Sequence, residues 1–198
     1  TVVDVWESMG DDFPEMLPAQ RESDLKAWVT IMYGCDKHCT YCIVPTTRGK
    51  ERSRAPEVIL REVQELARQG IKEVTLLGQN VNAYGKDLFG KGGFDFGDLL
   101  TLLDRETPGI ERIRFTTNHP KDFTRKMVEQ IAQASKVCQW FHLPVQSGSD
   151  SVLRRMKRSY NRKQYLQLVS WVRELMPDAV ITTDIIVGFP GETEEEFQ

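Results

Sequence analysis

The stretch YGCDKHCTYCIVP, residues 33–45, contains three of the four cysteines in this chain of 198 residues. Its thiols, Cys35, Cys39 and Cys42, have the spacing C-x3-C-x2-C. The stretch follows AWVTIMYG (27–34), a β-branched run that predicts a strand. The three thiols are therefore expected on a loop at the carboxyl end of the first strand of the fold.

Apolar runs and helical periods alternate beyond this loop, which implies βαβ units and a parallel sheet. Small and polar residues follow each apolar run, and in a parallel barrel such strand ends lie on one rim, where active sites are built. We predict an α/β fold, a βα barrel or partial barrel, with an open doubly wound sheet as the alternative. The further strands are expected over 72–80, 111–118, 138–146 and 179–190, and the helices over 55–70, 98–106, 122–133, 150–157 and 161–176.

Composition favours one soluble domain with a real core, since 40% of the residues are hydrophobic and 28% charged. A net charge of −3 argues against a general nucleic-acid coat but allows a local basic strip. No apolar run approaches the roughly 20 residues that span a bilayer, and the acidic N-terminus does not resemble a signal peptide. We expect a cytoplasmic protein without a membrane segment.

The two ends suggest a segment excised from a longer protein. Residues 1–25 are rich in Asp, Glu, Pro and Ser and are interpreted as a linker that leads in from a missing N-terminal domain, with the core domain over 26–198. At the other end, Thr193 and Glu196 form a predicted capping box for a helix that has only one turn.

The crowding of three thiols suits a metal better than a disulfide scaffold. A structural zinc needs a fourth ligand, and neither His38, inside the loop, nor Cys138, expected at the opposite end of the barrel, supplies it comfortably. Cys138 is expected to be buried and structural. Three thiolates suit a 4Fe–4S cluster in which one iron keeps an open position. A zinc-stabilised RNA-binding module without catalysis is the alternative from another class.

The spacing of the cysteines, with Tyr41 before the last of them, resembles the signature of the radical S-adenosylmethionine (SAM) superfamily. Longer motifs resemble the methylthiotransferases, and are most similar to the tRNA-modifying members that make 2-methylthio-N6-isopentenyladenosine, the MiaB type. The motifs are MYGCDKHCTYCIVPTTRGKERSR, EVTLLGQNVNAYG, RIRFTTNHP, HLPVQSGSD and TTDIIVGFPGETEEEF. Members acting on threonylcarbamoyl-adenosine in tRNA, or on a ribosomal protein, remain alternatives.

The resemblance implies a partial (β/α)6 TIM-like barrel, truncated here before its last strand. It implies a 4Fe–4S cluster on the three cysteines, with SAM on the open iron and a 5′-deoxyadenosyl radical that removes hydrogen from carbon 2 of N6-isopentenyladenosine next to the anticodon. A second 4Fe–4S cluster belongs to an N-terminal domain, and an RNA-binding domain follows the barrel. The implied partners are the tRNA anticodon loop, SAM and a reducing electron donor, for a monomeric enzyme. The chain alone is not expected to complete the reaction.

Site residues beyond the cysteines are predicted at the strand ends. Tyr41 is a candidate for contact with the adenine of SAM, and its alternative is ordinary loop packing. Strand-end residues are candidates for SAM or substrate contacts, with structural hydrogen bonding as the alternative at each position. They are Gly78, Gln79, Asn80, Thr116, Thr117, Asn118, His119, Gln146, Ser147, Asp184, Gly188, Pro190 and Gly191.

Arg48, Lys50, Arg52 and Arg54 form a basic strip after the cysteine loop. The resemblance implies contact with tRNA phosphates, for which arginine is suited because it presents two donors at once. A solvated surface run is the alternative, and it is also the preferred interpretation of RRMKR (154–158).

Overall fold

The computed structural model describes residues 23–198, so almost all of the expected linker over 1–25 lies outside the described residues. Strands β1 (Lys26–Thr30), β4 (Glu73–Leu77) and β5 (Arg112–Phe115) form a parallel sheet in that order. Strands β6 (Trp140–His142) and β7 (Val180–Thr182) form a second parallel pair. A parallel bridge between Ile113 and Val137 links β5 to the segment that leads into β6.

The parallel strands therefore follow one another in chain order, as they do in a βα barrel. A doubly wound sheet would reverse its strand order at a switch point. No reversal occurs among the described strands, so the partial barrel is confirmed and the doubly wound alternative is wrong.

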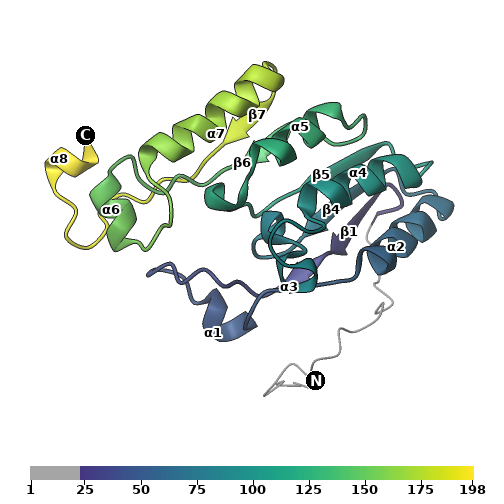
Figure 1. The fold of residues 1–198 in the computed structure, drawn as a ribbon, viewed down its shortest axis with the longest axis horizontal. Helices are drawn as coiled ribbons and strands as arrows, with labels where there is room; N and C mark the ends of the chain where they lie inside the picture. The colour runs from purple at the N-terminus through teal and green to yellow at the C-terminus, as the bar shows by residue number, and fades with distance from the viewer. Residues whose placement is uncertain (1–22) are drawn as a thin grey trace.

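Helices α2 (Pro56–Arg68), α4 (Phe96–Glu106), α5 (Arg125–Gln133) and α7 (Arg162–Leu175) pack as successive neighbours along the strands (Figure 1). The face of α2 that carries Ile59, Val63 and Leu66 is fully buried, as its periodicity predicts. Strand and helix side chains merge into one hydrophobic core. Polar residues follow the strands at their carboxyl ends, outside this core.

Capping boxes begin several helices of the fold. Thr193 with Glu196 begins α8 (Glu194–Phe197), as predicted, and Asn161 with Gln164 begins α7, within the helix expected over 161–176. Helix α8 lies beside α6 (Asp150–Arg155) in Figure 1, where Arg155 Nη2 and Glu196 Oε2 are 2.7 Å apart. This hydrogen-bonded ion pair lowers the pKa of the Glu196 carboxyl to about 2.

Several predicted strands are too long. The run over 179–190 forms a strand only at β7, and beyond it a single bridge joins Gln146 to Ile185. Short elements near the cysteine loop were not predicted, because they are shorter than the window over which periodicity can be recognised. They are α1 (Val44–Arg48), β3 (Arg52–Ser53), η1 (Val81–Ala83), α3 (Lys86–Phe89) and η2 (Pro120–Asp122), whereas β2 (Met32–Tyr33) is the end of the strand predicted over 27–34. Over residues 23–198, none of the helices combines the length and the apolar character needed to cross a membrane.

Candidate functional site

The cysteine loop begins where β2 ends and is closed at its base by backbone contacts. Strands β2 and β3 pair antiparallel, and Cys35 N donates to Gly49 O at 3.1 Å. Gly34, at a φ of 72°, has space for a hydrogen only, because a Cβ there would lie 1.9 Å from Lys50 O. The loop is thus anchored to the carboxyl end of the first strand, as predicted.

The three loop cysteines have different environments. Cys39 is buried, Cys35 is half-buried and Cys42 is exposed, and all are free thiols. Burial raises the pKa of the Cys35 thiol to about 11. Among the described residues, no three His, Cys, Asp or Glu side chains are gathered closely enough to hold a metal ion. The assignment of the three cysteines as cluster ligands therefore stays a prediction.

Neither candidate fourth ligand for zinc forms a closed metal site with the three thiols among the described residues. His38 is exposed and lines a hollow of about 320 Å³ with Cys35, Asp36 and Lys50. Cys138 donates its backbone N–H to Ile113 O, near the amino end of β5, and is only partly buried. A donor set of three thiols on one loop fits an iron–sulfur cluster with one open iron better than a closed zinc site.

Asp122 connects the loop to the strand ends. Its side chain is 5% exposed and its Oδ2 lies 3.0 Å from Nζ of Lys37, a residue between the first two cysteines. Asn80 Nδ2 donates to Oδ2 at 2.8 Å, and Lys86 Nζ lies 2.5 Å from Oδ1. Although burial opposes ionisation, hydrogen bonds from Lys86 and Asn80 hold the pKa of Asp122 below its usual value. A buried carboxylate therefore fixes one half of the cysteine loop.

Three amide oxygens at the strand ends are buried and have no partner among the described residues. They are Gln79 Oε1, Asn80 Oδ1 and Asn118 Oδ1, after β4 and β5. The amide nitrogens of Asn80 and Asn118 donate to Asp122 and to His142 O, which fixes the amide orientation. Buried acceptors without partners are costly, so these oxygens are open to a ligand that brings hydrogen-bond donors. They fit the amino and hydroxyl groups of SAM.

Most of GQNVNAYG (78–85) supports the fold. A Cβ at Gly78 would lie 2.6 Å from Met32 Cγ, so its close backbone approach is to a neighbouring strand. Asn82 exchanges two hydrogen bonds with the backbone of His119, and Tyr84 Oη donates to Arg54 O at 2.7 Å. Within the motif, Gln79 and Asn80 are the residues that present unpaired atoms toward the site.

His119 is a structural, neutral imidazole in this setting. It is buried, its ring lies edge-on to Tyr160 at 5.6 Å, and Nδ1 accepts from Lys121 N. Burial, followed by repulsion from the Arg158 guanidinium, lowers its pKa well below 6.5. At neutral pH, His119 can therefore accept a hydrogen bond, but its ring carries no charge.

This burial predicts acid sensitivity. The imidazole is faced by Arg158, Lys37 and Lys121, with Asp122 the opposing charge. Because the folded pKa lies below the unfolded value, stability is complete above pH 6.5 and falls below it, by up to about 1.4 kcal/mol per pH unit. Chemical denaturation of the His119→Gln variant between pH 7 and 4.5 should show a smaller loss than the original chain. An equal loss in both would contradict the neutral assignment.

The predicted residues after β5, β6 and β7 differ in burial and in backbone conformation. Gln146 is buried with a φ of 70°, and Thr117, after β5, has a φ of 63°. Such left-handed residues cost about 1–2 kcal/mol and are concentrated at functional sites. Asp184 is neither in a strand nor buried, because β7 ends at Thr182, and its Oδ2 lies 3.2 Å from His142 Nε2. Gly188 is exposed, and a Cβ added to it would have no atom within 4 Å.

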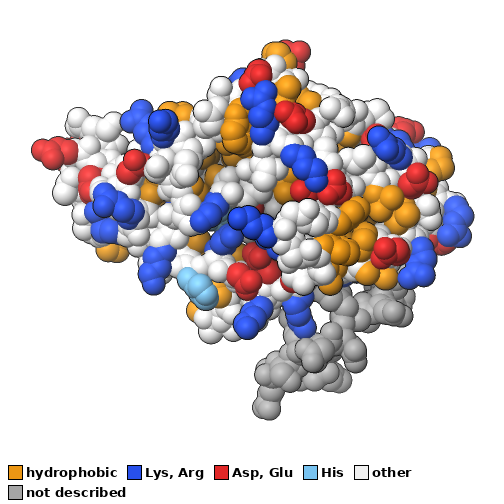
Figure 2. Space-filling model, in the orientation of Figure 1, with side chains coloured by type: hydrophobic (Ala, Val, Ile, Leu, Met, Phe, Trp, Pro, Cys, Tyr) orange, Lys and Arg blue, Asp and Glu red, His pale blue; other side chains and the backbone are white. Residues whose placement is uncertain are grey.

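The basic strip after the loop is only partly correct. Arg54 is 8% exposed, donates to Thr30 O at 2.6 Å and pairs with Glu62 at 2.7 Å, so it is structural and cannot reach RNA. Arg48 and Lys50 are exposed, and Arg52 is partly buried in β3. On the face shown in Figure 2, basic and acidic side chains are interspersed. Phosphate binding by Arg48, Lys50 and Arg52 stays a prediction.

Sequence reasoning misses Arg158, whose charged neighbours predict a solvated helix face. Its Nη1 lies 3.3 Å from both Cys39 Sγ and Tyr41 Oη. Tyr41 is exposed on its other side, and burial raises the pKa of its hydroxyl to about 12. Charged residues at 154–158 give no signal of this contact, because Arg158 is 119 residues from Cys39.

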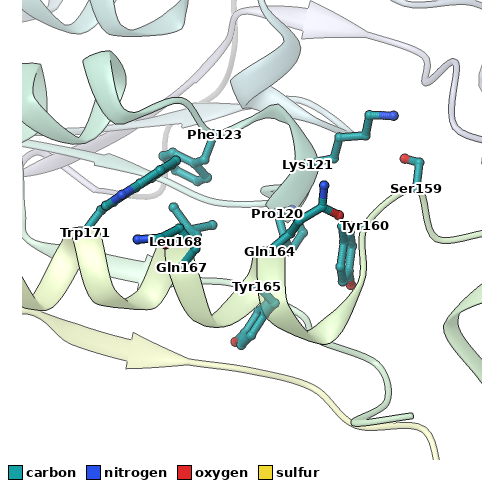
Figure 3. A pocket seen from close by; sticks show the side chains of 10 residues that line it. All are labelled: Pro120, Lys121, Phe123, Ser159, Tyr160, Gln164, Tyr165, Gln167, Leu168 and Trp171. Carbon is teal, nitrogen blue, oxygen red and sulfur yellow. The ribbon is translucent and has the colours of Figure 1, made fainter. Parts of the chain in front are cut away.

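A second hollow, of about 340 Å³, lies between α7 and η2. Figure 3 shows Trp171, Leu168 and Gln164 on α7 directed toward Phe123 and Pro120. Tyr160 also lines it, but the hydroxyl of Tyr160 is directed to Pro144 O and Val145 O. The cysteines do not line this hollow.

Comparison with known proteins is consistent with this geometry. The model of the Radical SAM superfamily matches residues 29–198. A tRNA-2-methylthio-N(6)-dimethylallyladenosine synthase from Symbiobacterium thermophilum is 87% identical over 201 aligned residues, covering 100% of this chain and 43% of the relative. The protein of that name from Staphylococcus epidermidis is 57% identical, over 100% of this chain and 38% of the relative. The chain thus spans about two fifths of the length of these relatives.

Solved structures share the fold at low identity. The radical S-adenosylmethionine methyltransferase TsrM from Kitasatospora setae has a TM-score of 0.67 at 18% identity, covering 87% of this chain and 32% of that one. Methylornithine synthase has a TM-score of 0.56 at 13% identity, covering 83% of this chain and 45% of that one.

Proposed function

Because the chain belongs to the radical SAM superfamily, we propose that it is the radical SAM part of a tRNA methylthiotransferase. The proposed reaction is methylthiolation of carbon 2 of N6-isopentenyladenosine next to the anticodon. Relatives up to 87% identical carry the corresponding synthase name, which supports the substrate. The rest of the reaction, including sulfur insertion at a second cluster, requires parts outside this chain.

The observation that carries the proposal is the arrangement of the rim. The three-thiol loop lies at the carboxyl end of the strands, together with the unpaired oxygens of Gln79, Asn80 and Asn118. Cys35, Cys39 and Cys42 would hold a 4Fe–4S cluster, and the bound cluster with SAM supplies hydrogen-atom abstraction from an unactivated carbon. Binding of the metal requires the thiols to lose their protons.

The strand-end residues would bind and orient SAM. The three amide oxygens would accept hydrogen bonds from its donors, and Gln146, which has a backbone φ of 70°, is the proposed contact after β6. Tyr41 offers its ring beside Cys42 for an adenine. Asp184, exposed and beside His142, and Gly188 complete the side nearest β7. The enzyme is proposed to be a cytoplasmic monomer that takes electrons from a reducing donor.

Loss of a single acceptor tests the SAM site. Gln79→Met removes an unpaired, buried oxygen, so we expect about tenfold weaker SAM binding to the reconstituted chain, the worth of one hydrogen bond. Gln130→Met is the matched control, because Gln130 also has an unpaired buried oxygen but lies on α5. Equilibrium dialysis measures both, and SAM cleavage under reductant follows. Wild-type affinity in Gln79→Met would contradict the site, and bound zinc without SAM cleavage would favour the zinc module.

The basic strip provides a separate test of the RNA substrate. An anticodon stem-loop containing N6-isopentenyladenosine should bind with an affinity that falls with salt. Replacing Arg48 and Lys50 together by glutamine should lower the slope of log affinity against log salt by about 1.5, since each contact contributes about 0.7–0.9. Arg162→Gln with Lys163→Gln, on exposed positions of α7, is the control. An unchanged slope in the loop variant would place the RNA elsewhere.

A further inference from the structure

Arg158 is a half-buried cation, and the side chains that act on its charge among the described residues are Tyr160, Tyr41 and Cys39, with no carboxylate. Its Nε lies 3.0 Å from Tyr160 Oη, its Nη2 is 3.4 Å from Pro144 O, and its guanidinium lies 5.0 Å from the centroid of the Tyr160 ring. The remaining contacts of Nη1 are Cys39 Sγ and Tyr41 Oη. None of these partners is a carboxylate.

A half-buried guanidinium without a counter-ion is partly desolvated, and this cost is offset only by pairing or by strong hydrogen bonds. The contacts described above fix its direction. The carbonyl of Pro144 and the hydroxyl of Tyr160 hold the guanidinium from one side. Its Nη1 is directed at Cys39, which is buried. A thiolate at Cys39 would supply the missing negative charge.

The backbone around Arg158 is fixed to the same loop. Thr40 N donates to Met156 O at 3.2 Å and Thr40 Oγ1 donates to Arg155 O at 3.2 Å. Residues 39–41 therefore rest on the turn after α6, while Lys37 is held by Asp122 on the other side of the loop. The distance between Arg158 and Cys39 is thus determined by backbone contacts as well as by the guanidinium.

We propose that Arg158 is a positioning residue for the cluster, with metal-bound Cys39 thiolate as its counter-ion. This inference rests on the proposed function, because it requires that Cys39 is a cluster ligand. A charged donor to a ligand sulfur stabilises the more negative, reduced state, so it raises the reduction potential.

The test is an anaerobic redox titration of the reconstituted chain, followed by electron paramagnetic resonance of the reduced cluster. In Arg158→Gln, the ratio of oxidised to reduced cluster at a fixed potential should rise about tenfold, a shift of about 59 mV for one electron. Arg158→Lys keeps a positive charge but lacks the planar guanidinium, so the shift in reduction potential should be smaller. Arg154→Gln, an exposed arginine on α6, should match the original chain. An Arg158→Gln cluster with the original potential would overturn the inference.

The experiment distinguishes failure of the proposed function from failure of this inference. If the original chain takes up no iron, the proposed function fails. If it takes up iron and both Arg158 variants keep its potential, only this inference fails. If Arg158→Gln does not fold, Arg158→Lys decides the matter: a lowered potential supports the inference and an unchanged one overturns it.

Discussion

Replacing Gly34 by alanine is expected to lower the free energy of unfolding by about 2–5 kcal/mol and to prevent iron uptake. A left-handed alanine costs about 1–2 kcal/mol, and a steric overlap in a packed region adds about 1–3. The overlap here is severe, because the new Cβ would lie 1.9 Å from Lys50 O and 2.6 Å from Gly49 O. Both are backbone atoms, so no rotamer change can relieve it. The contact that must open is the one from Cys35 N to Gly49 O.

Gly49→Ala is the matched control for this prediction. Gly49 lies in the same loop at almost the same φ, 73°, but has no atom within 4 Å of its Cβ position. It should lose only the conformational part, about 1–3 kcal/mol for alanine at a φ of 73° and a ψ of −161°. Urea denaturation and iron analysis compare the two variants. Equal effects would show that the close approach at Gly34 does not hold the cysteine loop.

Asp122→Asn is expected to cost about 3 kcal/mol of stability and to reduce the iron bound per chain. Removal of one partner from a buried ion pair costs about 3–5 kcal/mol, and the lower end applies because Lys86 is 46% exposed and can turn to water. Lys37 is only 22% exposed and lies between two of the cysteines. Without the carboxylate it loses its hydrogen-bonded partner and keeps only the weaker attraction of Glu51, so this half of the loop should loosen.

Glu129→Gln is the control for Asp122, because its pair with Arg125 is 44% exposed on both sides. An exposed pair contributes at most about 1 kcal/mol. Urea denaturation gives the free energies, and iron is measured at a urea concentration where both variants are folded. If the variants have the same stability, Asp122 is not the anchor of the loop.

The layers of the fold could be predicted because their signals are local. The apolar periodicity of α2 and the capping boxes at Asn161 and Thr193 need only a few neighbouring residues, and the structure contains each of them. The strand expected over 179–190 is too long for the same reason. Its apolar residues Ile185 and Val187 are 64% and 62% exposed, and a β-branched run alone does not show where pairing stops.

The cysteine loop of the site could be predicted from the sequence. The residues that hold this loop in position could not. Three closely spaced thiols are visible in the sequence, and so are the amides at the strand ends. Asp122, Lys37 and Arg158 become important only through contacts across 85 and 119 residues. The spacing of Arg54 places it in the basic strip, whereas its partner Glu62, on α2, makes it structural.

Metal analysis is the most direct test of whether the cysteine loop binds a catalytic iron–sulfur cluster. Iron, sulfide and zinc should be measured after anaerobic reconstitution of the original chain, of Cys39→Ala and of Cys138→Ala. We expect about four irons and four sulfides per chain, lost in Cys39→Ala and kept in Cys138→Ala. Zinc in place of iron, or a full complement of iron in Cys39→Ala, would contradict the assignment.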